Sequence, residues 1–206
     1  AIAMALANDP SILVLDEPTT GLDATVEAEV LDLIAQLRSE LSASILFISH
    51  NLAVVSNMCD RVGVLYAGML VEEGPTNDVF NNPRHPYTVA LLRCLPRVGQ
   101  RKDQRRLDTI PGSLPGIGVA IKGCAFADRC ALATERCRTE FPPLYDLGDR
   151  LSRCHYHDKA QSLPRATAAD VAPSAPRAAT RPVLRVEALN KTYGSQGQGL
   201  RAVKDI

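Results

Sequence analysis

The stretch from Ser11 to Asp23, SILVLDEPTTGLD, constrains the fold more than any other part of the sequence. Its run of apolar residues, two of them β-branched, predicts a short strand buried on both faces. Asp16 and Glu17 end that strand, and Pro18 cannot continue a sheet ladder. Acids at the carboxyl end of a buried parallel strand lie where open α/β sheets bind ligands. Asp16 there suits a hydrated Mg²⁺ on nucleotide phosphates, and Glu17 suits the polarising of an attacking water.

A second strand is predicted to end beside the first. Asp23 can cap a helix that runs to Glu40 with its apolar residues at three- and four-residue steps. Residues 44–49, SILFIS, then form another buried strand, so strand, helix and strand make a parallel crossover of the α/β class. Both strands end at one edge of the sheet, which predicts that Glu17 and His50 share a site.

The order of these motifs resembles that of an ATP-binding cassette (ABC) ATPase. Asp16 and Glu17 correspond to the Walker B motif, Asp23 to the D-loop and His50 to the switch histidine. The resemblance implies the C-terminal half of a P-loop, RecA-like nucleotide-binding domain with ATP and Mg²⁺ as cofactors. It implies that Glu17 and His50 are catalytic, that Asp16 binds the cofactor, and that Asp23 lies at the interface between two such domains. No G-x-x-x-x-G-K-[ST] phosphate loop is present, so this chain by itself is expected to be inactive.

The sequence beyond the second strand predicts a hairpin over 61–74, followed by a separate C-terminal extension. The run NPRHPYT at 82–88 resembles the C-terminal extension of ABC ATPases that serve oligopeptide, dipeptide and related (peptide/nickel) importers. A helix is expected over 89–95. After residue 157 Ala, Pro, Ser, Thr and Arg dominate and apolar periodicity is lost, which indicates a disordered linker. We therefore expect four regions: the C-terminal part of a first ABC domain (1–83), a cysteine-containing extension (84–157), a linker (158–182) and the start of a second ABC domain (183–206).

The second domain is predicted from a short pattern near the end of the sequence. Residues 183–189, VLRVEAL, alternate as a strand does and are followed by NKTYG. This resembles the first strand and aromatic A-loop of an ABC domain, with Tyr193 placed to stack on adenine. Another strand is expected to start at Ala202. The resemblance thus implies a fragment of a tandem, two-cassette subunit.

Four of the six cysteines, Cys124, Cys130, Cys137 and Cys154, lie within 31 positions. Because no signal-peptide pattern opens the sequence, we expect a reducing environment, where metal ligands or free thiols are favoured over disulfides. The spacing is not that of a CxxC zinc ribbon, so an iron–sulfur cluster, [4Fe–4S] before a single zinc, is the preferred hypothesis. Inert thiols are the alternative. His155 and His157 adjoin the last cysteine and rank below the thiols as ligands.

Composition limits the partners. Lys plus Arg and Asp plus Glu are equal at 23 each, which gives no indication of nucleic acid. Apolar runs are far shorter than the ~18 residues of a membrane span, so membrane association is expected only through a partner. The resemblance implies an importer subunit that powers uptake of peptides or related substrates from the cytoplasmic face of the plasma membrane. Its implied partners are membrane permease subunits, a second ABC domain in the same chain or a dimer and, indirectly, a periplasmic or extracellular substrate-binding protein.

Two other classes of function remain open from the sequence. One is a non-transporter ABC ATPase that acts in DNA repair or translation, against which the extension and the cysteines argue. The other is a metal or iron–sulfur module with a degenerate ATPase remnant, against which the joint presence of Glu17 and His50 argues. The transported substrate, whether dipeptide, oligopeptide, glutathione or a nickel complex, is not encoded in these motifs.

Overall fold

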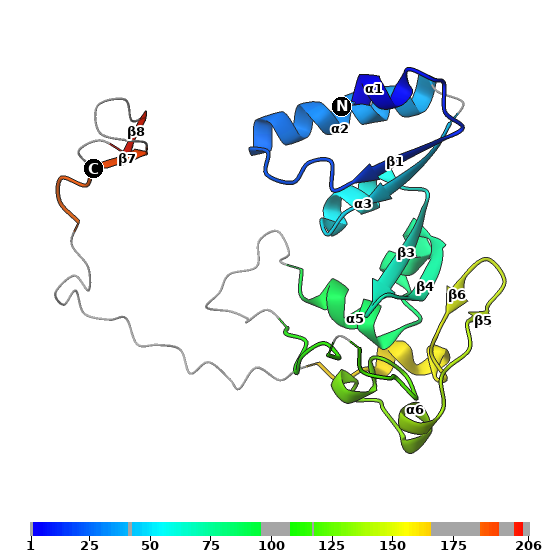
Figure 1. The fold of residues 1–206 in the computed structure, drawn as a ribbon. Coiled ribbons are helices and arrows are strands. Elements are labelled where there is room, and N and C mark those ends of the chain that lie inside the picture. The colour runs from blue at the N-terminus through cyan, green and yellow to red at the C-terminus, as the bar shows by residue number, and fades with distance from the viewer. Residues whose placement is uncertain are drawn as a thin grey trace. The chain divides into compact units, whose positions relative to one another are not determined.

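The computed structural model describes residues 2–40, 43–95, 108–116, 118–165, 186–193 and 200–203 (Figure 1). It divides into two compact units, Ala1–Ala168 and Ala169–Ile206. The elements of the first unit are α1 (Ile2–Leu6), β1 (Ile12–Asp16), α2 (Ala24–Glu40), β2 (Ser44–Ile48), α3 (Leu52–Met58), β3 (Arg61–Tyr66), β4 (Met69–Pro75), α4 (Thr76–Asn81), α5 (Pro86–Arg93), η1 (Ala127–Arg129), α6 (Glu135–Thr139), β5 (Tyr145–Asp146), β6 (Leu151–Ser152) and η2 (His157–Ser162). Those of the second are β7 (Lys191–Tyr193) and β8 (Leu200–Val203).

The parallel crossover predicted from the sequence is present. β1 and β2 pair in parallel with Asp16 opposite Ile48, and α2 connects them. The helix begins where it does because the Asp23 carboxylate accepts the backbone N–H groups of Thr25 at 3.0 Å and Val26 at 3.1 Å. The α/β class of this part of the chain is therefore confirmed.

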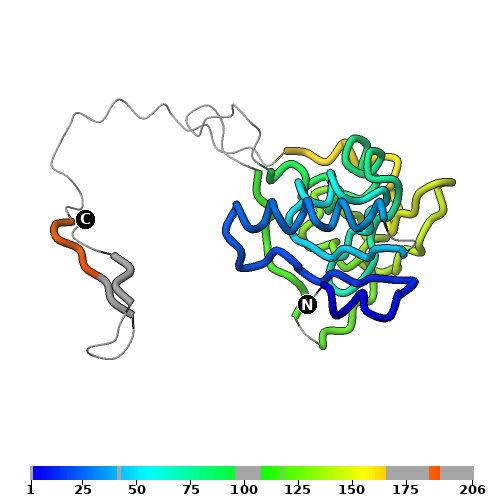
Figure 2. The backbone as a smooth tube through the Cα atoms, turned by 90° about the horizontal axis from the view of Figure 1, so that it is seen from above, coloured from blue at the N-terminus to red at the C-terminus, as the bar shows by residue number. Residues whose placement is uncertain are grey.

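Burial of β1 differs from the prediction. Leu13 and Leu15 are buried and pack with Ile34 of α2, whereas Ile12 and Val14 are 63% and 55% exposed. The prediction of burial on both faces is wrong for the described residues. The physical reason is that α1 and α2 cover the same face of the β1–β2 pair (Figures 1 and 2), and no described segment covers the other.

A second, antiparallel sheet has the strand order β3-β4-β6-β5. β3 and β4 form the expected hairpin, which turns at Ala67 and Gly68, both with positive φ, as a tight two-residue turn requires. β6 returns from the extension and pairs with β4, so that Glu72 lies opposite Ser152. The boundary predicted after residue 83 thus falls within one compact unit, and strands from both sides of it share a sheet.

The first residues of the predicted linker are ordered and belong to the first unit. They form η2, where Ala160 is fully buried, and the Arg93 guanidinium donates to the carbonyl groups of Leu163 at 2.7 Å and Gln161 at 3.2 Å. A buried alanine and two backbone contacts hold this segment against α5, which the polar composition did not indicate. The rest of the predicted linker, residues 166–182, lies outside the described residues.

In the second unit, β7 and β8 are antiparallel, with Tyr193 opposite Leu200. The strand predicted over 183–189 is not found in its described part, and β7 begins two residues later. Ala188 has a positive φ of 51°, which interrupts an extended conformation. The strand predicted to start at Ala202 belongs to β8 and starts earlier. Across the described ranges, no helix combines the length and apolar character that crossing a membrane requires.

Candidate functional site

Glu17 and His50 meet at the carboxyl edge of the β1–β2 pair. The backbone N–H of Glu17 donates to the Ile48 carbonyl at 2.9 Å and so extends the ladder by one residue. His50 Nδ1 lies 2.7 Å from Glu17 Oε2 and 2.9 Å from Oε1. The structure therefore brings together the two residues that the sequence placed at a common edge.

The surroundings of Glu17 favour an ionised carboxylate. The hydrogen bond from His50, followed by the hydroxyl of Thr20 at 2.7 Å, lowers the pKa of Glu17. Its backbone has φ of +48°, a conformation that non-glycine residues seldom adopt and that recurs at functional sites. A carboxylate held in the charged form at an open edge has the chemistry of a proton acceptor.

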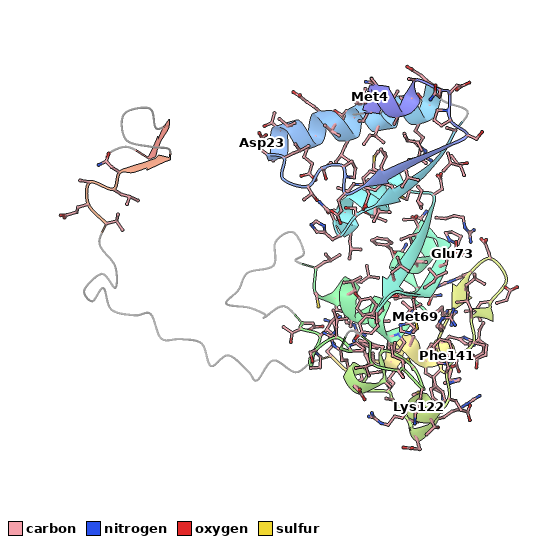
Figure 3. The ribbon with its side chains drawn as sticks, viewed as in Figure 1. Met4, Asp23, Met69, Glu73, Lys122 and Phe141 are labelled. Atoms are coloured by element: carbon pink, nitrogen blue, oxygen red, sulfur yellow. The ribbon has the colours of Figure 1, made fainter. Side chains whose placement is uncertain are left out.

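The remaining predicted site residues are Asp16, Asp23 and Tyr193. Asp16 is the last residue of β1 and is exposed beside Glu17. Asp23 stands at the start of α2 (Figure 3), and its side chain already serves as the helix cap. Tyr193 is the last residue of β7 in the second unit, and the structure describes only its backbone. The predicted cofactor contacts of Asp16, Asp23 and Tyr193 stay predictions.

A cavity in the extension gathers all four clustered cysteines. It measures about 20 Å³, room for about one water molecule. It is lined by sulfur-bearing, aromatic and imidazole side chains, among them Cys124, Cys130, Cys137, Cys154, His85, Phe126, His155 and Tyr156. His157, the lower-ranked alternative ligand, is not among the lining residues and packs on the ring of Tyr145 at 5.4 Å instead.

Close backbone packing brings the cysteines together. The N–H of Cys124 donates to the Cys137 carbonyl at 2.7 Å. A Cβ on Gly123 would lie 2.3 Å from that same carbonyl oxygen, so only glycine permits the approach. Phe126, 2% exposed, anchors the segment through ring contacts with Tyr66 and Tyr87 at 5.2 and 5.4 Å.

Cys137 and Cys154 are buried, Cys124 and Cys130 are half-buried, and backbone N–H groups lie near three of the four sulfur atoms. The backbone N–H of Tyr156 donates to Cys154 Sγ at 3.4 Å, and backbone N–H groups of nearby residues also act on Cys124 and Cys130. Burial nonetheless raises the pKa of Cys130 to about 11 and of Cys154 to about 12, so these thiols are protonated at neutral pH. Among the described residues, no three His, Cys, Asp or Glu side chains are placed to hold a single metal ion.

A buried polar network borders the cavity. Glu72 is fully buried and accepts the backbone N–H groups of Arg84 at 2.6 Å and His85 at 2.9 Å, while the Arg150 guanidinium donates to it at 3.1 Å. Burial raises the pKa of Glu72, and these donors oppose that effect. His85 is 1% exposed, and its Nδ1 accepts the N–H of Tyr87 at 3.1 Å. Burial lowers the pKa of His85 to about 3, against a smaller opposing effect of the Arg153 backbone.

Sequence reasoning missed both buried residues of this network. It treated the run at 82–88 as a family motif and a helix start, without a chemical role for His85. For Glu72 a signal was available, because neighbouring residues of a strand point to opposite faces and one of two adjacent glutamates must face inward. The half-buried neighbour Glu73 pairs with Arg61 at 2.8 Å instead.

Comparison with known proteins gives a consistent set of similarities. Residues 71–137 match the family model described as the oligopeptide/dipeptide transporter, C-terminal region. The chain is 45% identical over 156 residues to the dipeptide transport ATP-binding protein DppD of Escherichia coli, covering 75% of this chain and 47% of that protein. It is 49% identical over 158 residues to a Brucella ovis protein to which peptide import and ATP binding are provisionally ascribed, covering 74% of this chain and 47% of that protein.

These relatives are longer than the region matched. The chain spans about half the length of the curated relatives it matches, 47% in both cases. Among solved structures it is similar to CbiO1 of Clostridium perfringens, part of the ABC transporter complex CbiONQ, at 33% identity. That similarity covers 44% of this chain and 36% of CbiO1 with a TM-score of 0.37, a value too low to assign a fold by itself.

Proposed function

We propose that this chain, which belongs to the ATP-binding proteins of the oligopeptide/dipeptide ABC transporter type, is part of a subunit that hydrolyses ATP to power substrate uptake. The observation that carries the proposal is the contact of His50 with Glu17 at the carboxyl edge of a parallel strand pair. Open α/β sheets bind their ligands at that edge. The substrates are peptides or related compounds, since the relatives carry peptide and dipeptide import in their names.

Each predicted site residue then has one role. Glu17, whose carboxylate is ionised and reachable from solvent, accepts the proton of the attacking water. His50 contacts the γ-phosphate, and Asp16, an exposed carboxylate beside the base, holds Mg²⁺ through water and so helps neutralise phosphate charge. Asp23 lies at the contact with a second ABC domain, and Tyr193 stacks on the adenine of the second cassette.

The proposed setting follows from the same family. The subunit binds permease subunits from the cytoplasmic face of the membrane and works as a pair of ABC domains, in one chain or as a dimer. A substrate-binding protein outside that membrane acts on it only indirectly. The match over residues 71–137 favours this transporter assignment over an ABC ATPase of DNA repair or translation.

The test of the proposed hydrolysis is Glu17→Gln in the full-length protein. The amide keeps the shape of the side chain but cannot take the water's proton, so phosphate release should fall by roughly 10²-fold or more while ATP binding persists. Glu29→Gln, an exposed glutamate of α2, is the matched control and should hydrolyse at the wild-type rate. Wild-type hydrolysis by Glu17→Gln would remove Glu17 from the mechanism.

We further propose that Cys124, Cys130, Cys137 and Cys154 hold a [4Fe–4S] cluster with a structural role. Their shared cavity and the N–H groups around their sulfur atoms support this, since thiolates with such donors are the usual cluster ligands. Because the cavity is small, the four side chains have to move apart on loading.

Protein purified without oxygen tests the cluster. On this proposal it is brown, absorbs near ~400 nm and contains about four irons per chain. Cys137→Ser should lose most of the iron, whereas Cys59→Ser, outside the cavity, should retain it. Stoichiometric zinc without iron would convert the site to a zinc centre, and four thiols that titrate freely in the folded protein would refute any metal.

A further inference from the structure

The Glu17 carboxylate has a second donor besides His50. The Thr20 hydroxyl donates to Glu17 Oε2 at 2.7 Å, and His50 Nδ1 lies at the same distance from that oxygen. The other oxygen, Oε1, lies 2.9 Å from the same nitrogen. Hydrogen bonds to an ionised carboxylate are short and roughly twice as strong as those between neutral groups. Thr20 therefore makes a strong contact with the side chain to which the proton transfer is assigned.

The turn that follows β1 explains why Thr20 reaches back to Glu17. The Thr20 N–H donates to the Glu17 carbonyl at 3.1 Å, which closes a turn over residues 17–20. Pro18 is the second residue of that turn, and its ring fixes φ at a value that such turns favour. The backbone and the side chain of Thr20 thus both bind Glu17, and the hydroxyl is held in place before any substrate arrives.

The contact with Thr20 limits how the carboxylate can turn. The side chain of Glu17 is 35% exposed and that of His50 is 79% exposed, so packing alone does not fix the pair. A glutamate side chain that is not held keeps much of its rotamer freedom, which has to be lost before the carboxylate can act on a water. Donors to Oε2 from two segments of the chain reduce that freedom, and they leave Oε1 with only the longer contact to His50.

We propose that Thr20 is a positioning residue for ATP hydrolysis, which holds Glu17 Oε2 so that Oε1 receives the proton of the attacking water. The inference rests on the proposed function of Glu17. Thr20 neither gives nor takes a proton in the reaction and acts only through the orientation of the carboxylate. Because a small error in the position of a reacting group costs much of the rate, loss of the hydroxyl should lower turnover without weakening ATP binding.

The experiment measures kcat and, separately, the dissociation constant of ATP in the full-length protein. Thr20→Val exchanges the hydroxyl for a methyl group of similar size, so kcat should fall about tenfold while the dissociation constant stays within about twofold. Thr20→Ser keeps the hydroxyl and should recover most of the rate, whereas Thr20→Ala should match Thr20→Val. Thr25→Val makes the same exchange at an exposed position in the first turn of α2 and should hydrolyse ATP at the wild-type rate.

The same exchange in the Glu17→Gln background separates positioning from a merely structural role. With no carboxylate base to orient, Thr20→Val should leave the residual rate unchanged, and a further tenfold fall there would overturn the inference. A wild-type kcat in Thr20→Val, or a loss that Thr20→Ser does not recover, would overturn it as well. These outcomes leave the role of Glu17 intact if Glu17→Gln is slow. Wild-type hydrolysis by Glu17→Gln would instead overturn the proposed function of Glu17 and the role of Thr20 together.

Discussion

The sheet edge and the cysteine cavity place reactive groups in opposite environments. At the edge, the His50 side chain is 79% exposed and that of Glu17 is 35% exposed, and the pair depends on two strands with one uncovered face. Around the cavity, Glu72 and His85 are at most 1% exposed, and the cysteines come from α6 and from the segments before and after it. The carboxylate–imidazole pair thus lies open to solvent, whereas the groups around the cavity lie largely enclosed.

The largest expected effect tests whether the enclosed region depends on its buried charge. Glu72→Gln removes the anion that receives two backbone N–H groups and the Arg150 guanidinium. Because an unpaired buried charge is left behind, the local free energy of unfolding should fall by about 3–5 kcal/mol. Hydrogen exchange of β4 and β6 measures it.

Glu73→Gln is the control for this substitution, since Glu73 is the neighbouring residue of the same strand and pairs with Arg61 nearer the surface. Its loss should cost about 0–1 kcal/mol. Equal losses of free energy in the two variants would mean that burial of Glu72 adds no stability. The stated difference between the enclosed cavity and the open sheet edge would then be wrong.

A smaller effect is expected from the close packing of Gly123 against the Cys137 carbonyl. Gly123→Ala sets a Cβ against the Cys137 carbonyl and the backbone of Arg138 at 2.3–2.6 Å, which should destabilise the segment by about 1–3 kcal/mol. Gly116→Ala meets only the Val119 side chain, at 3.2 Å, which needs to shift by a few tenths of an ångström, so this substitution should cost much less. Hydrogen exchange of the described residues in 120–140 compares them, and wild-type protection in Gly123→Ala would show that the close approach is dispensable.

The smallest effect belongs to the open edge. Asp23→Ala removes the cap of α2 and should weaken its first turn by about 1 kcal/mol, whereas Asp23→Asn keeps an oxygen acceptor and should restore most of it. Hydrogen exchange at Thr25 and Val26 reports the difference. If Asn is as costly as Ala, the negative charge of Asp23, rather than its cap, supports the edge.

The sequence predicted the elements whose signals are local. The cap at Asp23, the crossover from β1 to β2 and the hairpin at Ala67 and Gly68 each depend on a few neighbouring residues, and the structure has all three. The meeting of Glu17 with His50 could also be anticipated, because parallel strands end on the same side of a sheet. The four cysteines were singled out from their number and spacing alone.

What the sequence did not predict depends on distant contacts. Burial of β1 on one face only follows from which helices cover it, and the run ILVL does not contain that information. Glu72 can be buried because Arg150, the residue before β6, donates a hydrogen bond to it. The strand pattern around Glu72 gives no indication of this distant partner. The segment 183–189 alternates as a strand does, yet a strand forms only where the chain finds a pairing neighbour, which in the described residues is at 191–193.

The pairing of β4 with β6 also bears on the order in which the protein folds. Glu72 and Arg150 are 78 residues apart in the sequence, and a contact of that separation forms slowly because a long loop must close first. During synthesis β3 and β4 emerge well before β6, and until then β4 has a free edge and the Glu72 carboxylate has no guanidinium partner. Cys154, which follows β6, is the last of the four cysteines to emerge, so closure of the sheet and completion of the cavity both wait for the same segment.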